Sequence, residues 1–444
     1  MYPDTGSRSY QLLQRGSRVI PGGNTRSAVF YPPYPIYMAS GHGCRIVDVD
    51  GVERLDFVNC NSAAIHGHGH PYVVEAVARQ ARTLMASGMP TEGEVRLAEL
   101  ICERLPSVEQ VRFNNSGTEA LMFAVRAARS HTGRTLIVRC EGTYNGSYDD
   151  LFTSIRPLPD QWGPAGRPST VPYSEGLPPA VVQDVVVIPF NDPAAAQRIF
   201  AEIGDRVACV VIDPFPSYLG FLRASDEFLS TLRELTHRHG ALLIYDEVFS
   251  FRLDYHGAQG FFGVMPDLTA LGKVIGGGLP VGAVGGPRHI MQLFDHSHGH
   301  ARVEHSGTFS GNPMTMAAGI ATLELLTPAA CLQLNALGER VRKGLRRALA
   351  DAGIAGQVRG EASMVVLLFH DIDYNEYRGF LSGYTPAILE TAMSFHRFML
   401  NHGVIFIAPG AFILSTAMTE HDIDQMLVAA AEGLREIARG QVSA

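Results

Sequence analysis

Short apolar runs that alternate with helical stretches are the feature that most limits the folds open to this chain. The runs are rich in β-branched residues and lie at 135–140, 184–190, 207–213, 241–246 and 281–286. Helical periodicity separates several of them, most clearly at 224–240. Such alternation of strand and helix predicts an α/β domain with a large, doubly wound and mostly parallel sheet.

The length of the chain points to more than one domain. A single hydrophobic core stops growing near about 250–300 residues, and this chain has 444. Beyond residue 315 the mixture of helices and short strands is typical of an α+β domain, which both chain ends are expected to share. We therefore predict an N-terminal segment of the small domain at 1–65, a large domain at 66–315 and a C-terminal small domain at 316–444.

Charge and composition argue against several classes of partner. The net charge of −8 offers no attraction for nucleic acid or for an anionic membrane. No apolar run approaches the about 18 residues of a membrane span, and the first residues do not resemble a secretion signal. The six cysteines are scattered and form no CxxC pair, so we expect reduced thiols and a cytoplasmic protein.

Lysine is scarce, which narrows the search for a nucleophilic amine. The sequence contains only Lys273 and Lys343. An arginine cannot replace them, because its guanidinium stays protonated and does not attack a carbonyl. Lys343 lies in ERVRKGLRR, which is typical of a solvated helix face, whereas Lys273 lies between an apolar run and a glycine-rich turn. Lys273 is therefore the favoured nucleophile.

A possible phosphate site lies at Asn115-Ser116-Gly117-Thr118, between an expected strand and an expected helix. The start of a helix offers free N–H groups and the positive end of its dipole, to which hydroxyl side chains add donors. The alternative is an ordinary helix N-cap with Glu119 in the first turn.

Asp246 ends the apolar run at 241–246, and Lys273 ends the next expected strand. Ligands in parallel α/β sheets bind beyond the carboxyl ends of the strands, so both side chains should reach the same edge. A carboxylate there could keep a pyridine nitrogen protonated and make the ring an electron sink. The alternatives for Asp246 are a helix cap and a metal ligand.

These residues belong to longer stretches that resemble a known family, the class III or ω-type aminotransferases. Within it the chain is most similar to the branch of glutamate-1-semialdehyde aminomutase and the β-amino-acid aminotransferases. The matching stretches are PGGNTRSAVFYPPYP, GHGHP, VRFNNSGTEA, YDEVFSFRLDYHGAQGFFGVMPDLTALGKVIGGGLPVGAVGG and HSGTFSGNPMTMAAG.

The resemblance implies fold type I of the pyridoxal-phosphate enzymes and pyridoxal 5'-phosphate as cofactor. Lys273 would carry the cofactor as a Schiff base and shuttle a proton, and Asp246 would pair with the pyridine nitrogen. The resemblance also implies a homodimer with a shared active site, because Thr308 of one subunit would contact the cofactor of the other. The other implied cofactor contacts are Ser116, Gly117 and Thr118 at the phosphate, Val248 and Tyr144 on the two ring faces, and Thr308 from the neighbouring subunit.

Some positions depart from the family pattern or bear on the substrate. Asn145 stands where the family usually has a histidine, and Tyr218 stands near the expected contact to the phenolic oxygen of the cofactor. Arg26 matches a residue that grips a substrate carboxylate, and Asn61 matches a pocket residue that is often aromatic. No arginine occurs between 398 and 434, so the usual clamp for a second carboxylate is missing.

The favoured function is transfer of an amino group between an amine or (β-)amino acid and a keto acid or aldehyde. An intramolecular aminomutase, a decarboxylase or racemase, and a silent cofactor-binding protein are the alternatives. Histidines could bind zinc, but no cysteine or acidic residue completes either set in sequence, so we expect no metal. The two sets are His66, His68 and His70, and His296, His298, His300 and His305.

Overall fold

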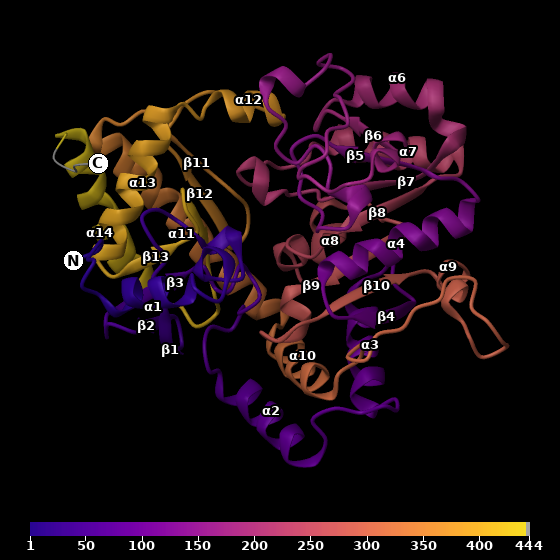
Figure 1. Ribbon diagram of the computed structural model, residues 1–444, viewed down its shortest axis with the longest axis horizontal. Coiled ribbons are helices and arrows are strands. Elements are labelled where there is room, and N and C mark those ends of the chain that lie inside the picture. Colours follow the sequence, from indigo (N-terminus) through magenta and orange to yellow (C-terminus); the bar gives the residue numbers. More distant parts are fainter. Residues whose placement is uncertain (441–444) are drawn as a thin grey trace. The chain divides into compact units, whose positions relative to one another are not determined.

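The computed structural model describes residues 1–440, and the chain forms two compact units (Figure 1). The central unit consists of Tyr72–Cys331 and Asp373–Leu381. The terminal unit consists of Met1–Pro71, Leu332–Ile372 and the residues from Ser382 onward. Both chain ends therefore contribute to one unit, and a short segment of the C-terminal part returns to the other.

A seven-stranded sheet forms the middle of the central unit, in the order β4-β10-β9-β8-β7-β5-β6. Every neighbouring pair is parallel except those of β10, which runs antiparallel to β4 and β9. The mostly parallel sheet expected from the sequence is thus confirmed. The strands are β4 (Gln110–Asn114), β5 (Leu136–Cys140), β6 (Val185–Ile188), β7 (Val207–Ile212), β8 (Leu242–Asp246), β9 (Leu268–Gly272) and β10 (Gly282–Gly286).

Helices cover both faces of this sheet. All residues of β7 are buried, and because successive side chains of a strand point to opposite faces, both faces must be covered. On one face, Cys209 and Val211 share a hydrophobic core with helix α4 (Gly117–Thr132). Helix α7 (Asp226–His239) also packs against β7 and β8. This is the doubly wound arrangement predicted from strand–helix alternation.

The ends of these two helices follow from local sequence. The Ser116 hydroxyl caps α4 by accepting the Glu119 N–H, and α4 ends at Gly133 with φ 70°. In the same way Ser225 caps α7, which ends at Gly240 with φ 63°. Serine at the N-cap satisfies a backbone donor that the helix leaves free, and glycine adopts the left-handed C-terminal conformation without steric cost.

The other helices of the central unit surround this sheet or lie beside it. Helix α12 comes from the C-terminal part of the sequence, although almost all of it belongs to the central unit by its contacts. The other helices of the central unit are α2 (Pro71–Thr83), α3 (Glu92–Arg104), α5 (Pro179–Gln183), α6 (Pro193–Ile203), α8 (Gly257–Phe262), α9 (Arg288–Met291), α10 (Pro313–Leu325) and α12 (Tyr377–Ser382).

The terminal unit contains two small sheets and long helices. One sheet has the order β1-β2-β3-β13 and the other β11-β12-β14. Its strands are β1 (Met38–His42), β2 (Arg45–Asp48), β3 (Glu53–Phe57), β11 (Gln357–Arg359), β12 (Met364–Leu368), β13 (Val404–Phe406) and β14 (Ala411–Ile413). Its helices are α1 (Arg8–Gly16), most of α11 (Pro328–Ala352), α13 (Pro386–Asn401) and α14 (Glu420–Ala438).

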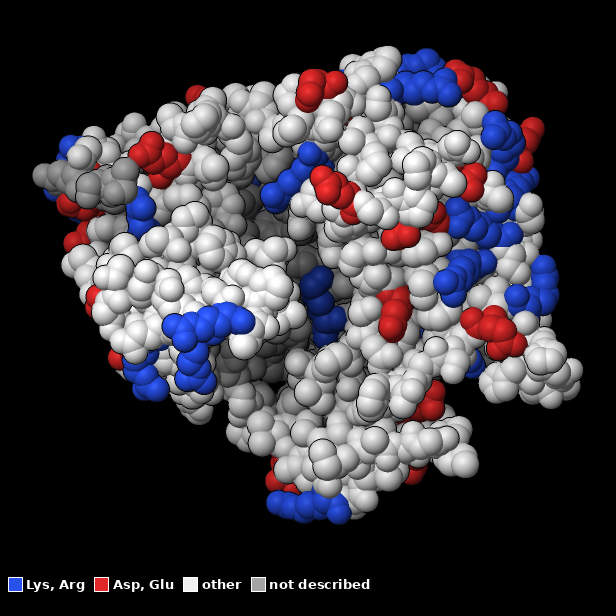
Figure 2. Space-filling view, in the orientation of Figure 1, with Lys and Arg blue, Asp and Glu red and all other residues white. Residues whose placement is uncertain are grey.

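Within residues 1–440, no single helix is both long and apolar enough to cross a membrane. Only α10 and α11 meet that test together, as a pair bent by 76°. On the face of the molecule seen in Figure 2, basic and acidic side chains are interspersed.

Candidate functional site

Asp246 and Lys273 lie at the carboxyl ends of neighbouring parallel strands. Asp246 is the last residue of β8 and pairs in register with Ala270 of β9, and Lys273 directly follows β9. The sequence-based expectation that both reach one edge of the sheet therefore describes the structure. Lys273 is partly buried and has a φ of 48°, a left-handed conformation that non-glycine residues rarely adopt. Such backbone strain is concentrated at functional sites.

The Asp246 carboxylate is almost completely buried, with 5% of the residue exposed. The Asn145 amide donates to one of its oxygens at 2.9 Å and the Val248 N–H to the other at 3.1 Å. Burial raises the pKa of Asp246, while the Asn145 hydrogen bond and the Lys273 charge oppose that rise. Two donors to the ionised form keep the negative charge at this position.

A second carboxyl group, Asp213, lies close to Asp246. Burial raises the pKa of Asp213 well above its usual range, and the Asp246 charge raises it further. Two carboxylates close together in a buried place do not both ionise readily. Because Asp246 has the better donors, we assign the negative charge to Asp246 and the proton to Asp213.

Glu247, the residue after Asp246, has a structural role. It is fully buried and accepts hydrogen bonds from the N–H groups of Ala258 at 2.6 Å and Gln259 at 3.2 Å. Burial raises the pKa of Glu247 to about 7. The helix-cap alternative considered for Asp246 therefore applies to its neighbour, which holds the start of α8.

The start of α4 forms a tight loop beside Val248. A Cβ atom on Gly117 would lie 2.8 Å from both Val248 methyl groups, so only glycine fits there. The hydroxyls of Ser116 and Thr118 accept N–H groups from Glu119 at 3.1 Å and Ser147 at 3.2 Å. Each hydroxyl keeps its own proton to donate. The N-cap alternative is thus realised, and it leaves donors available for an anion.

An aromatic stack extends from the loops that follow β5 and β7. The rings of Tyr144 and Tyr218 lie 5.1 Å apart and are inclined by only 14°. The Arg156 guanidinium lies 4.9 Å from the centre of the Tyr218 ring. Tyr144 immediately precedes Asn145, so the stack is connected through the backbone to the Asp246 contact. Burial raises the pKa of Tyr218, which keeps its phenol neutral.

The loop that carries Tyr144 is held by a buried ion pair that the sequence did not reveal. Arg378 of α12 donates to both oxygens of Glu141, at 3.0 and 3.2 Å, and to the carbonyl groups of Trp162 and Gly163 at 2.8 and 3.1 Å. Glu141 is 1% exposed. The segment Asp373–Leu381 therefore anchors the loop from the end of β5 to residue 163.

Replacing Arg378 by glutamine is expected to lower the free energy of unfolding by about 3–5 kcal/mol, because it leaves a buried carboxylate without its partner. Burial already raises the pKa of Glu141, and Arg378 opposes that rise. Without Arg378 the folded state therefore holds this proton more tightly than the unfolded state does. Stability should be greatest below the usual Glu pKa and fall as the pH rises.

Urea unfolding at pH 5 and pH 8 measures this effect. The variant that also carries Glu141→Gln removes the unpaired charge and is the matched control. Its stability should recover part of the loss and should no longer depend on pH through this group. An equal loss at both pH values, or no recovery in the double variant, would contradict the assignment.

The predicted substrate residues Arg26 and Asn61 belong to the terminal unit. Arg26 is exposed, and its backbone N–H donates to the Asn24 side chain at 2.9 Å. Asn61 lies in a run of four residues with positive φ: Asn59 (45°), Cys60 (50°), Asn61 (51°) and Ser62 (85°). The buried Asn59 amide fixes this left-handed turn by donating to the Ile413 carbonyl at 2.6 Å. No glycine signals this turn in the sequence.

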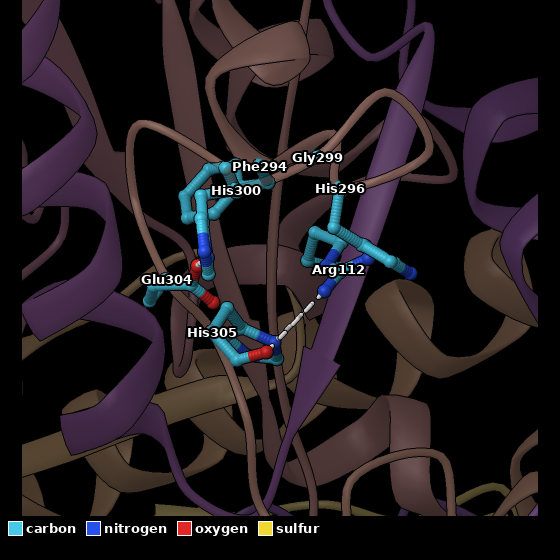
Figure 3. A pocket seen from close by; sticks show the side chains of 8 residues that line it. Arg112, Phe294, His296, Gly299, His300, Glu304 and His305 are labelled. Atoms are coloured by element: carbon cyan, nitrogen blue, oxygen red, sulfur yellow. Dashed lines mark hydrogen bonds and ion pairs between the residues drawn. The ribbon is translucent and has the colours of Figure 1, made fainter.

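Thr308 lies in an exposed turn beside Phe309, which is 59% exposed. Three of the histidines that precede it, His296, His300 and His305, line a cavity of about 350 Å³ together with Arg112 of β4 (Figure 3). Arg112 donates to the His305 carbonyl at 3.4 Å, and burial followed by the Arg112 charge lowers the pKa of His305 to about 4. Within residues 1–440, no three His, Cys, Asp or Glu side chains are grouped to hold a metal ion.

Comparison with known proteins places these residues in a family context. The family model for aminotransferase class-III matches residues 27–431. The chain is 38% identical to a glutamate-1-semialdehyde 2,1-aminomutase of Methanothermobacter thermautotrophicus, over 96% of this chain and 99% of that protein.

Two solved structures are similar over nearly their whole length. An ω-transaminase from Sphaerobacter thermophilus is 45% identical, with 99% of each chain covered and a TM-score of 0.95. A β-phenylalanine aminotransferase from Variovorax paradoxus is 35% identical, with 98% of this chain and 95% of that chain covered and a TM-score of 0.86.

Proposed function

This chain belongs to the aminotransferase class-III family of pyridoxal-phosphate enzymes, and from that premise we propose that Lys273 and Asp246 carry its chemistry. The main support for this proposal is that the two residues lie at the ends of neighbouring parallel strands, next to the Gly117 loop. The proposed reaction moves an amino group from an amine or (β-)amino acid to a keto acid or aldehyde.

The residues present fit pyridoxal phosphate. A phosphate group suits the start of α4, where Ser116 and Thr118 retain hydroxyl protons and Gly117 leaves room for the backbone to approach. The buried Asp246 carboxylate suits a protonated pyridine nitrogen. Val248 and Tyr144 offer an apolar side chain and an aromatic face for a flat ring. When bound, the cofactor supplies an electron sink for the carbanion that forms at the substrate Cα.

Lys273 has two proposed tasks. Its amine would hold the cofactor covalently, because lysine is the residue type whose amine can bond to an aldehyde. Its Nζ atom would also accept the proton that leaves the substrate Cα and carry it toward the cofactor. The partly buried position and the rigid left-handed backbone hold Nζ in place, and a positioned general base of this kind contributes about 10²–10⁴-fold.

Asp246 has an electrostatic task. Asn145 and Val248 donate to its carboxylate, so Asp246 would stabilise positive charge at the ring nitrogen of the bound cofactor. Asn145 cannot titrate, in contrast to the histidine expected at this position. The hydrogen bond from Asn145 to the Asp246 carboxylate therefore does not depend on the protonation state of its donor.

The proposed substrate class rests on the similar structures and on two residues of the terminal unit. The ω-transaminase and β-phenylalanine aminotransferase among the similar structures favour an amine or β-amino acid donor. Arg26 is proposed to bind a substrate carboxylate and Asn61 to line the pocket from its left-handed turn. The aminomutase relatives support a second candidate, in which donor and acceptor are parts of one molecule.

An absorbance titration of the holoenzyme with amines and amino acids tests the proposal. A donor should remove the visible band of the lysine-bound cofactor, and a keto acid added afterwards should restore it. Release of a new keto compound together with this cycle supports an aminotransferase. Isomerisation of a single compound without an added acceptor supports the aminomutase, and release of CO₂ or loss of optical activity alone would contradict both.

We also propose a homodimer in which Thr308 reaches the cofactor phosphate of the partner subunit. Thr308 is exposed in the single chain, which is expected of a residue that acts in another subunit. The central unit exposes several large apolar side chains, which suit a contact with a second copy. They are Met85, Met89, Val95 and Phe309. The thiol state of all six cysteines supports a cytoplasmic location.

Thr308→Ala is expected to weaken cofactor binding by about 10–100-fold. A charge-assisted hydrogen bond contributes about 1.5–3 kcal/mol, and about 1.4 kcal/mol corresponds to tenfold. Equilibrium dialysis of the cofactor measures the change, and light scattering measures the oligomer. Ser306→Ala, in the same exposed stretch, is the control and should bind normally. A monomer with full activity would refute the shared site.

A further inference from the structure

Arg156 occupies an unusual place next to the proposed site. It is exposed, and its guanidinium lies 4.9 Å from the centre of the Tyr218 ring, which stacks on Tyr144 at 5.1 Å. Tyr144 precedes Asn145, whose amide binds Asp246. All five residues belong to the central unit. A cation thus lies at the outer end of an aromatic stack that leads to the proposed cofactor site.

The charge of Arg156 is not compensated within the described chain. Among residues 1–440, no Asp or Glu oxygen lies within ion-pair distance of its guanidinium. Glu141 is the acid that shares its surroundings, because Glu141 and Arg156 both influence the pKa of the Tyr377 phenol. Both oxygens of Glu141 are already bound by Arg378. The local acid therefore has its own partner and does not neutralise Arg156.

We propose that Arg156 is a specificity-determining residue that binds a carboxylate group of the substrate. A guanidinium stacked on an aromatic ring keeps its N–H groups free at the edge, and those groups match a carboxylate bidentately. Stacking also limits the motion of the side chain, so less entropy is lost on binding. Amino acids and keto acids are then favoured over amines and aldehydes that lack a carboxylate.

The inference rests on the proposed aminotransferase function and adds a substrate class to it. The usual second arginine near the last strands is absent, since none occurs between 398 and 434. Arg156 offers a guanidinium from a different part of the chain. The carboxylate in question is either the single one of a monocarboxylate or the distal one of a dicarboxylate, and the choice of acceptors separates the two.

Steady-state kinetics of Arg156→Met, Arg156→Lys and the matched control Arg167→Met test the proposal. Arg167 lies in the same long connection but pairs with Glu202 on the surface. With one donor throughout, the acceptors are pyruvate, 2-oxoglutarate and the uncharged butanal. Arg156→Met keeps the apolar contact with Tyr218 and should lower kcat/KM about 10–100-fold for an acid, with less than about threefold change for butanal.

Arg156→Lys should recover part of the loss, because it restores the charge but not the bidentate geometry. A loss confined to 2-oxoglutarate identifies the distal carboxylate, and a loss shared with pyruvate identifies the single one. An equal loss for acids and butanal would show that Arg156 only supports the stack, and would overturn the proposal.

A binding measurement separates this inference from the proposed function. Propanoate and glutarate cannot donate or accept an amino group, but each should raise the Tm of the wild-type holoenzyme if its carboxylate is bound. Arg156→Met should lose that rise for the acid that Arg156 binds, and Arg167→Met should keep it. A wild-type protein stabilised by neither acid, or a variant stabilised as much as the wild type, overturns the role of Arg156. A wild type that moves no amino group to any acceptor overturns the proposed function instead.

Discussion

Replacing Lys273 by alanine is expected to abolish amino-group transfer. Both roles proposed for Lys273 would disappear together: the covalent anchor of the cofactor and the amine that moves the substrate Cα proton. The second alone accounts for about 10²–10⁴-fold, so kcat should fall at least that far. Lys343 cannot substitute, because it lies on the exposed face of α11, where its amine is 3.7 Å from Glu339.

The scarcity of lysine makes this prediction unusually easy to check. Borohydride makes a lysine–cofactor bond permanent, and peptide mapping then identifies the residue. The label should lie on Lys273 in the wild-type protein and disappear in Lys273→Ala. Lys343→Ala is the control and should keep both label and turnover. Labelling of Lys343 alone, or near-normal turnover in Lys273→Ala, would disprove the assignment.

The parts of the site that depend on local sequence could be predicted. Ser116 marks the start of α4 because capping is decided within a few residues. The positions of Asp246 and Lys273 followed from chain order, since two parallel strands joined by one crossover bring their carboxyl ends to one edge. The antiparallel course of β10 was not predicted, because the short apolar run at 281–286 has no feature that sets its direction.

The parts that depend on distant contacts could not be predicted. The ion pair of Arg378 with Glu141 joins residues that are 237 positions apart in the sequence, so no local pattern signals it. The left-handed turn around Asn61 is fixed by Asn59 and a carbonyl group of β14. Asp213 follows a strand as Asp246 ends one, so its position could be read from the sequence. Its raised pKa could not, because that depends on burial and on the nearby Asp246 charge.

Replacing Asp246 by asparagine is the second change with a large expected effect. Asparagine has nearly the same shape, so the hydrogen bond of the Val248 N–H can persist, but the negative charge is lost. The Asn145 amide would then face an oxygen or another amide, depending on how the new side chain turns. Loss of a preorganised electrostatic group costs about 10²–10³ in kcat. The cofactor should still bind, because the start of α4 and Lys273 are unchanged.

The pH dependence of kcat is a second test of the role assigned to the Asp246 charge. Asn145→Ala keeps the Asp246 charge but removes the donor that lowers the pKa of Asp246. The pKa should therefore rise, and the acidic limb of the kcat profile should move to higher pH, whereas Asp246→Asn should lose that limb. Asn145→Gln, which restores an amide, should bring the limb part of the way back. If Asp246→Asn turns over normally, or if Asn145→Ala leaves the acidic limb in place, then Asp246 is not the group that holds the ring nitrogen charged, and Asp213 becomes the residue to examine.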